Sequence, residues 1–211
     1  MLSDEVTPLS AASAIVIRDP FEVLMMRRHA GASFMPNAWV FPGGIAEELD
    51  HELGGMKITA VRETFEETGV WLGAPLEDAE PKRRRLLAGS MSIRHLLAEA
   101  PLDLETLVLT SRWITPAGVP KRFDTWFYLA KAAPDTIATA EDNEAVDVTW
   151  IHPADALEKH AAREMQIVFP TLRNLEALCG FASADELIES RRGITVEPIM
   201  PVLVNGRPTL P

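Results

Sequence analysis

The sequence lacks the features of several protein classes. It has one cysteine in 211 residues, Cys179, which excludes an intramolecular disulfide framework and is typical of a reducing compartment. We expect Cys179 to be a small buried apolar residue on a late helix. No apolar run approaches the ~20 residues that a membrane-spanning helix needs, so we expect no membrane partner. Residues 1–8 are acidic and do not resemble a signal peptide, so we expect a cytoplasmic protein.

Positive charge is also scarce. The chain has 20 Lys and Arg against 31 Asp and Glu, a formal net charge of −11. Non-specific nucleic-acid binding requires a basic surface, so we expect no nucleic-acid partner. Hydrophobic residues make up 47% of the chain, which is ordinary for a globular protein. The length suits one domain over residues 1–211.

Three glutamates stand out because they lie within one turn of a predicted helix over residues 57–68. Glu63, Glu66 and Glu67 fall on one side of it, within an arc of roughly 100°. The opposite side carries Ile58, Val61, Phe65 and Thr68 and can pack on a sheet. Like charges at this spacing destabilise an isolated helix. A divalent cation with oxygen ligands, Mg²⁺ or Mn²⁺, is the natural compensation.

The pattern around this helix alternates strands and helices. We predict a strand hairpin from residues 12–17 and 23–26 and a short strand at 38–41, stopped by Pro42-Gly43-Gly44. Residues 45–56 are predicted as a loop and 75–106 as a helical insertion, with Pro81 opening one helix and Ser92 capping the next. Later elements are strands at 107–114, 123–130 and 147–151, a helix beginning at His152-Pro153, and helices at 170–179 and 184–191. We expect residues 198–211 to be an irregular, proline-rich tail.

The residues Gly44, Asp50, Arg62-Glu63, Glu66-Glu67 and Gly69-Val70 resemble the signature of the Nudix hydrolases. Two features depart from that signature. The first acidic position is Asp50 where glutamate is usual, and the span from Asp50 to Arg62 is four residues longer than the family spacing. The resemblance implies an α/β/α sandwich on a mixed sheet and the hydrolysis of a diphosphate linked to another group.

The resemblance also implies a set of site residues. The implied metal ligands are Glu63, Glu66, Glu67 and the Gly43 carbonyl, and the implied catalytic residues are Arg62, Glu63, Glu66 and Glu144. Glu144 is the best placed of three late acidic residues, Glu141, Asp142 and Glu144, which could also be a solvated loop. The implied substrate-binding residues are Gly43, Gly44, Arg112 and Arg122.

Flanking segments are similar to one branch of the family, the acyl-coenzyme A diphosphatases. They are residues 34–44, Ser111-Arg112-Trp113-Ile114-Thr115-Pro116 and Arg122-Phe123-Asp124-Thr125. That branch splits coenzyme A or its thioesters into 3′,5′-ADP and (acyl-)phosphopantetheine. A second signature is matched only in part, since Arg28 stands where serine is expected after Arg27. ADP-ribose, nucleotide sugars and dinucleotide polyphosphates remain alternative substrates, and a non-catalytic nucleotide-sensing module is an alternative of another class.

Several basic residues have two interpretations. Arg112 and Arg122 either bind the nucleotide or pair with Asp124 and the acidic loop. The run Lys82-Arg83-Arg84-Arg85 is predicted to be a solvated helix face. The tryptophans at 39, 113, 126 and 150 are predicted to be core residues, with stacking on adenine as the alternative. The oligomeric state stays open, with a homodimer among the alternatives.

Overall fold

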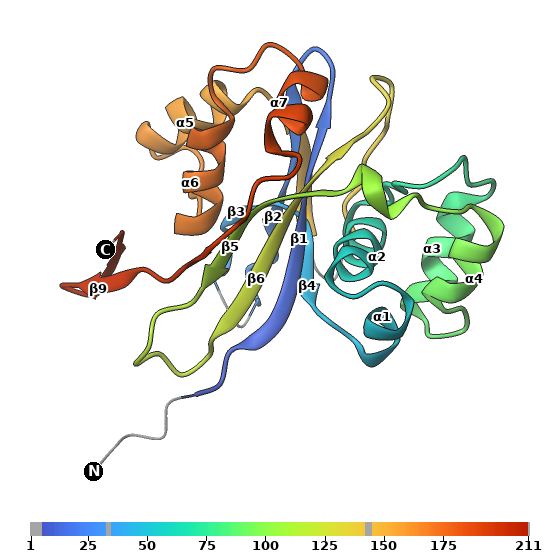
Figure 1. The fold of residues 1–211 in the computed structure, drawn as a ribbon, viewed down its shortest axis with the longest axis horizontal. Coiled ribbons are helices and arrows are strands. Elements are labelled where there is room, and N and C mark those ends of the chain that lie inside the picture. Colours follow the sequence, from blue (N-terminus) through green and yellow to red (C-terminus); the bar gives the residue numbers. More distant parts are fainter. Residues whose placement is uncertain (1–5, 33–34, 142–144, 211) are drawn as a thin grey trace.

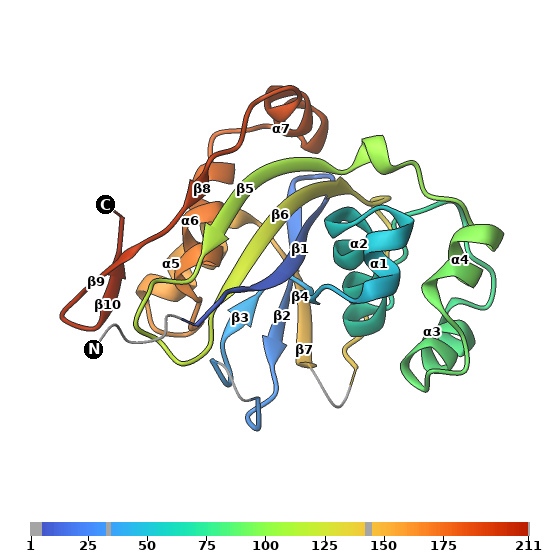
Figure 2. The same ribbon diagram turned by 60° about the horizontal axis from the view of Figure 1, so that its bottom comes forward.

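A mixed β-sheet forms the centre of the computed structural model, which describes residues 6–32, 35–141 and 145–210 (Figures 1 and 2). β1 runs parallel to β6 and antiparallel to β2 and β4, β5 is antiparallel to β6, and β7 is antiparallel to β2. The strands are β1 (Leu9–Arg18), β2 (Glu22–Arg28), β3 (Trp39–Val40), β4 (Gly43–Ile45), β5 (Val108–Ile114), β6 (Phe123–Lys131), β7 (Ala145–Ile151) and β8 (Pro198–Ile199).

Helices cover both faces of the sheet, so the predicted α/β/α sandwich is confirmed (Figure 1). One layer contains α5 (Pro153–Ala161), α6 (Phe169–Leu178) and α7 (Ala184–Arg191). The other contains α1 (Glu48–Leu53), α2 (Met56–Thr68), α3 (Ala79–Leu87) and α4 (Ile93–Glu99), followed by a 3₁₀ turn, η1 (Leu104–Thr106). Residues 75–106 contain α3, α4 and η1, the helices expected there, and Ser92 caps α4 as expected.

Strand β1 supplies both halves of the core because its side chains alternate between the two faces. Ile15 and Ile17 are fully buried in the cluster that includes α6 and α7. Ala12 and Ala14 are buried on the other face, in the cluster that includes Ala60 of α2. The small alanine side chains allow α2 to pack close to the sheet, which brings its acidic side beside β4.

The apolar side of α2 packs against two separate groups of side chains. Val61 packs into the sheet cluster. Ile58 and Phe65 pack instead with Leu96 and its neighbours in the helical insertion. The helix ends where Gly69 adopts a left-handed conformation with φ of 71°, which glycine accepts without steric cost.

Two segments differ from the prediction near the Nudix-like residues. The segment predicted as a loop, 45–56, contains α1, because Glu47 and Asp50 form a reciprocal capping box at its start. The strand predicted at 38–41 is β3, which ends at Val40, and Gly43–Ile45 then forms β4 against β1. The extra residues between Asp50 and Arg62 are therefore mostly helical.

The tail prediction is also wrong for most of residues 198–210. β8 joins the main sheet beside β5, and β9 (Val202–Val204) pairs with β10 (Arg207–Thr209) in a hairpin. Asn205 and Gly206 form its turn with φ values of 52° and 75°. Asn-Gly favours this type of hairpin turn, and the surrounding prolines obscured that signal.

Cys179 is exposed rather than buried, because it follows the last turn of α6 at the surface. Among the described residues, no helix is both long enough and apolar enough to span a membrane.

Candidate active site

Two adjacent glycines bring the backbone of β4 into close contact with its neighbours. A Cβ atom at Gly43 would lie 2.4 Å from the Ala12 carbonyl oxygen, and one at Gly44 would lie 2.5 Å from the Glu63 carboxylate. Ser13 holds the residue that precedes this strand, because its hydroxyl donates to the Pro42 carbonyl at 2.7 Å. Any side chain at position 44 would occupy the space of the Glu63 carboxylate.

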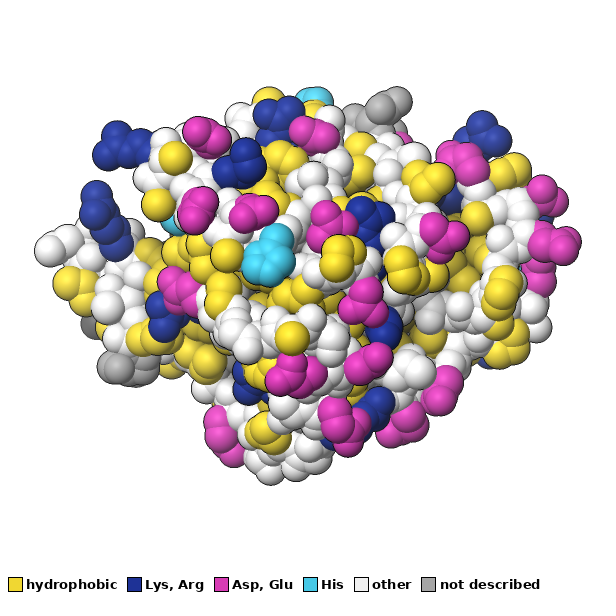
Figure 3. All heavy atoms as spheres, turned by 90° about the horizontal axis from the view of Figure 1, so that it is seen from above, with side chains coloured by type: hydrophobic (Ala, Val, Ile, Leu, Met, Phe, Trp, Pro, Cys, Tyr) yellow, Lys and Arg dark blue, Asp and Glu magenta, His cyan; other side chains and the backbone are white. Residues whose placement is uncertain are grey.

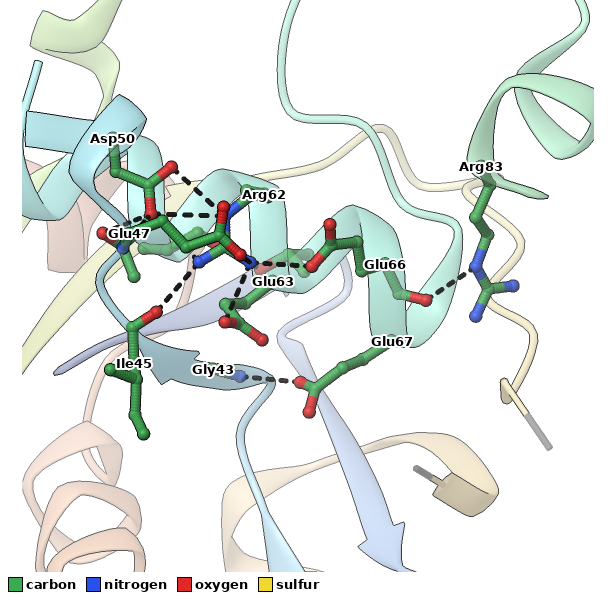
Figure 4. A network of polar contacts seen from close by, with 12 residues as sticks. Gly43, Ile45, Glu47, Asp50, Arg62, Glu63, Glu66, Glu67 and Arg83 are labelled. Carbon is green, nitrogen blue, oxygen red and sulfur yellow. Dashed lines mark hydrogen bonds and ion pairs between the residues drawn. The ribbon is translucent and has the colours of Figure 1, made fainter. Parts of the chain in front are cut away.

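The acidic side of α2 faces this glycine pair (Figure 4). The Gly43 N–H donates to Glu67 Oε2 at 2.8 Å, and Glu67 is only 4% exposed. The Glu63 carboxylate lies against Gly44, and Glu66 lies one turn along the helix from Arg62. The structure thus brings Gly43, Gly44, Glu63 and Glu67 together, and Glu66 is connected to Glu63 through Arg62.

Arg62 holds this group of carboxylates in place. Its Nη1 lies 2.8 Å from Glu66 Oε2 and 3.0 Å from Glu63 Oε1. Its Nε and Nη2 donate to the Asp50 carboxylate, and Nη2 also donates to the Ile45 carbonyl oxygen at 2.9 Å. All three nitrogens of the guanidinium are therefore bonded. The predicted role of Arg62 in holding the glutamates agrees with this geometry.

Asp50 explains how the unusual Nudix-like spacing is accommodated. Its side chain is fully buried and accepts from Arg62, from Thr59 Oγ1 at 3.0 Å and from the Glu47 N–H at 3.0 Å. Helix α1 brings this carboxylate back to Arg62 despite the four additional residues. Asp50 thus supports Arg62 from the side opposite the glutamates.

The charges around Arg62 change its pKa. Burial disfavours the charged guanidinium, but the hydrogen bond to Asp50 and the charges of Glu63 and Glu66 outweigh that penalty and raise the pKa of Arg62 well above its ordinary value. Arg62 therefore stays charged throughout the physiological pH range. It remains a permanent counter-ion for the carboxylates.

The same arrangement bears on the predicted metal site. Among the described residues, no three His, Cys, Asp or Glu side chains are arranged as a metal-binding group. Glu63 and Glu66 are instead paired with Arg62. The chemistry of the donors fits a hard cation, because Glu63, Glu66 and Glu67 offer only oxygen, and the missing side chain at Gly44 leaves room for the Glu63 carboxylate. Their roles as ligands stay predictions.

A cavity of about 1010 Å³ opens beside the glycines. At one end it is lined by Gly43, Gly44, Glu63 and Glu67. Apolar side chains from β5, β6, α6 and the C-terminal hairpin also line it, namely Trp113, Phe127, Phe169, Leu203 and Pro208. One cavity therefore combines an acidic, glycine-lined part with an apolar part.

Two cationic residues that the sequence analysis did not select line this cavity. They are Arg28 of β2 and Lys121, which precedes β6. Arg28 appeared in the sequence only as a departure from the expected serine. Acidic side chains are spread over the described part of the face in Figure 3, where Lys and Arg form no continuous patch. At the large cavity, Arg28 and Lys121 supply positive charge.

The two predicted substrate-binding arginines lie elsewhere. Arg112 forms a two-pronged pair with Asp124, at 2.8 and 2.6 Å, and its guanidinium lies 4.6 Å from the centre of the Trp126 ring. That pairing was the alternative interpretation. Arg122 is 4% exposed and donates to the carbonyl oxygens of Thr115 and Val6. Neither arginine is among the described residues that line the cavity.

The late acidic segment begins beside α2. The Glu141 N–H donates to the Glu67 carbonyl oxygen at 3.2 Å, and Thr139 makes a similar backbone bond to Thr68. Asp142 and Glu144 lie outside the described residues, so the predicted catalytic role of Glu144 stays a prediction.

Trp113 is buried as expected, whereas the other three tryptophans of the prediction are half-buried, at positions 39, 126 and 150.

One basic residue contradicts its predicted environment. Arg83, expected on a solvated helix face, is 3% exposed because residues 137–140 cover it. Its Nε donates to the Glu66 carbonyl oxygen at 2.8 Å and its Nη1 to Thr139 Oγ1 at 3.0 Å. Arg84 and Arg85 are exposed as predicted. No local signal distinguishes Arg83, since Thr139 lies 56 residues further along the chain.

Comparisons with known proteins agree with this geometry. The family model of the NUDT19 Nudix domain matches residues 51–178. A Caenorhabditis elegans protein that carries the name nudix hydrolase 7 is 30% identical over 91% of this chain and 67% of its own length. The acyl-coenzyme A diphosphatases NUDT19 of Gallus gallus and Homo sapiens are 26% and 25% identical, each over 79% of this chain.

The chain spans 63% of the length of each of these two NUDT19 relatives, less than two thirds. Among solved structures, the crystal structure of a NUDIX hydrolase from Alicyclobacillus acidocaldarius matches with a TM-score of 0.79 and 27% identity. That match covers 87% of this chain and 96% of the other. The similarity therefore extends across nearly the whole fold as well as the residues around the glutamates.

Proposed function

Because the chain belongs to the Nudix hydrolase family, we propose that it hydrolyses the diphosphate bond of a nucleoside-diphosphate derivative, with coenzyme A or an acyl-coenzyme A as the leading substrate. The observation that carries this proposal is the contact of Glu63 and Glu67 with the Gly43-Gly44 backbone inside a large cavity. Arg62 pairs with the Glu63 and Glu66 carboxylates and holds them in position.

Glu63, Glu66 and Glu67, with the Gly43 carbonyl, would hold one or more Mg²⁺ or Mn²⁺ ions. When bound, such ions neutralise charge on phosphoryl oxygens and lower the pKa of water. The glycine backbone gives the diphosphate room to approach the carboxylates. Arg62 keeps the Glu63 and Glu66 carboxylates oriented, because its own charge is permanent, and the Gly43 N–H holds Glu67.

In the proposed reaction, a water oxygen forms a bond to one phosphorus while the bridging P–O bond of the diphosphate breaks. The water proton passes to a carboxylate, for which Glu144 is our candidate. The segment that leads to Glu144 begins beside α2, where Glu141 bonds the Glu67 carbonyl. With coenzyme A, the products would be 3′,5′-ADP and phosphopantetheine.

Two features of the cavity support an extended substrate. Its volume of about 1010 Å³ is at the upper end of the usual range for ligand pockets. Its apolar part suits a pantetheine or acyl chain, and Arg28 and Lys121 can attract a further phosphate group. The relatives named NUDT19 are acyl-coenzyme A diphosphatases, which favours the same substrate class.

A hydrolysis panel with mass-resolved products tests the proposal. The purified chain would be incubated with Mg²⁺ or Mn²⁺ and coenzyme A, palmitoyl-coenzyme A, ADP-ribose, a nucleotide sugar or a dinucleotide polyphosphate. Release of 3′,5′-ADP, abolished by EDTA, would support the proposal. AMP from ADP-ribose at a higher rate would overturn the substrate assignment. Tight binding without metal-dependent turnover would identify a sensing module instead.

A further inference from the structure

A second cavity lies at the C-terminal end of α2 and has a volume of about 450 Å³. Its lining comes from the end of α2, the first turns of α3 and the segment before β7, and consists of Gly69, Ala79, Glu80, Arg83, Ile137, Thr139 and Ala140. None of these described residues lines the large cavity. The second cavity is thus separate from the candidate active site.

Arg83 has an unused hydrogen-bond donor in this cavity. Its side chain is 4% exposed, and its Nε and Nη1 are bonded to Glu66 and Thr139. In the described part of the chain, Nη2 is buried and has no hydrogen-bond partner. Figure 4 shows the two terminal nitrogens pointing away from α2. Because buried polar groups are nearly always hydrogen-bonded, this nitrogen points to a missing acceptor.

The beginning of α3 offers further donors to the same acceptor. The first N–H groups of a helix have no partner within it and favour anions. Asp78 precedes α3 in a left-handed conformation, with φ of 49°, and its side chain makes no capping bond. Ala79 and Glu80, the first two residues of the helix, line the cavity. The Thr139 hydroxyl accepts from Arg83, which leaves its own proton available for donation.

We propose that this cavity binds a phosphate group, held by Arg83 Nη2 together with the Thr139 hydroxyl and the N–H groups of Ala79 and Glu80, the first two residues of α3. The donors surround one cavity, and the guanidinium supplies a charge suited to an oxyanion. The Glu80 carboxylate opposes binding, since it lies 3.5 Å from Arg83 Nη1, although it is 57% exposed. The ligand is free inorganic phosphate or the phosphate of a nucleotide.

Binding would be measured by NMR and calorimetry on the full chain in EDTA, at constant ionic strength, so that metal-dependent binding at the glutamates does not contribute. We expect saturable binding of inorganic phosphate, with amide shifts at Gly69, Ala79 and Thr139. A nucleotide source would instead give tighter binding of 3′,5′-ADP at the same amides. Arg83→Met should weaken binding by about tenfold or more, because a charge-assisted bond is lost. The matched control is Arg94→Met, which removes the same charge from an exposed position on α4.

A second variant keeps the proposal testable if Arg83→Met fails to fold. Glu80→Gln removes the opposing carboxylate from an exposed position and should tighten phosphate binding by about two- to fivefold. Glu77→Gln, also exposed, is its control. The proposal is overturned if neither phosphate nor 3′,5′-ADP binds saturably. It is also overturned if affinity is the same in the folded Arg83 and Glu80 variants as in the unchanged chain.

Discussion

Two buried arginines lie at opposite ends of the acidic side of α2, and their surroundings differ. Arg62 and Arg83 are 4% and 3% exposed. Every nitrogen of the Arg62 guanidinium is bonded, mainly to carboxylates. In contrast, Arg83 bonds a backbone carbonyl and a hydroxyl and has one nitrogen without a partner among the described residues. The charge of Arg62 is thus neutralised by carboxylates of the protein, whereas Arg83 has one donor that can bind a further acceptor.

The difference follows from what each arginine neutralises. Arg62 lies between the fully buried Asp50 and two partly buried glutamates, so it compensates charges that would otherwise repel one another. Arg83 has one carboxylate nearby, that of the exposed Glu80. Removing either arginine takes a donor from acceptors around it, but only at Arg62 are those acceptors mainly charged. We therefore expect unequal effects when the two are replaced.

Arg62→Met should have the largest effect on stability. It leaves the Asp50 carboxylate buried without its cation, so we expect the free energy of unfolding to fall by about 3–5 kcal/mol. Urea denaturation of the metal-free protein measures this change. Arg94→Met, at an exposed ion pair, is the control and should change stability by less than about 0.5 kcal/mol.

A double-mutant cycle with Asp50→Asn identifies the cause. When Asp50 is replaced by neutral asparagine, the loss in the free energy of unfolding caused by Arg62→Met should be smaller by about 1–3 kcal/mol, because the buried charge is gone. Additive losses would show that Arg62 stabilises the protein through packing alone. That result would remove the distinction between the two arginines.

Glu67→Gln should have the largest effect on catalysis. The glutamine Oε1 can still accept from the Gly43 N–H, so the local fold is kept. The carboxylate charge is lost, and we expect turnover to fall by about 100- to 1000-fold. Steady-state kinetics with the best substrate of the panel measures this loss. Glu48→Gln, on the exposed side of α1, carries the same charge change and should retain full activity. Equal activity in the two variants would contradict the proposed role of Glu67.

Some features of this region could be predicted from the sequence, and others could not. Strands β1–β3 and β5–β7 and helix α2 follow from alternation, turn residues and Gly69, which are local signals, whereas β4 and β8–β10 were not expected. Helix α1 was missed because Glu47 begins it where serine or threonine is the usual sign of a capping box. The pairing of Arg62 with Glu63 and Glu66 could be anticipated from the family resemblance and their places on one helix, whereas its catalytic role stays a prediction.

Arg83 could not be assigned in this way. It belongs to a run of four basic residues, and such runs are usually solvated. Its burial depends on packing between α3, the end of α2 and residues 137–140, which are distant in sequence. The same is true of Arg28 and Lys121, which line the large cavity from different strands and loops.

Arg83→Met tests the other half of the comparison. It leaves the neutral Glu66 carbonyl and the Thr139 hydroxyl without a donor, so we expect a loss of about 1–3 kcal/mol in the free energy of unfolding. The same urea denaturation applies, and the loss should be smaller than for Arg62→Met. A larger loss would mean that Arg83, not Arg62, is the main buried counter-ion of this region.

Thr139→Val should have the smallest effect and separates the two bonds of Arg83. Valine preserves the shape of threonine but removes the acceptor of Nη1, while the bond from Nε to the Glu66 carbonyl remains. We expect a loss of about 0.5–1.5 kcal/mol, close to that of a single hydrogen bond. Combining it with Arg83→Met should add little, because both changes remove the same bond. If the two losses were fully additive, Thr139 would stabilise the segment independently of its bond from Arg83.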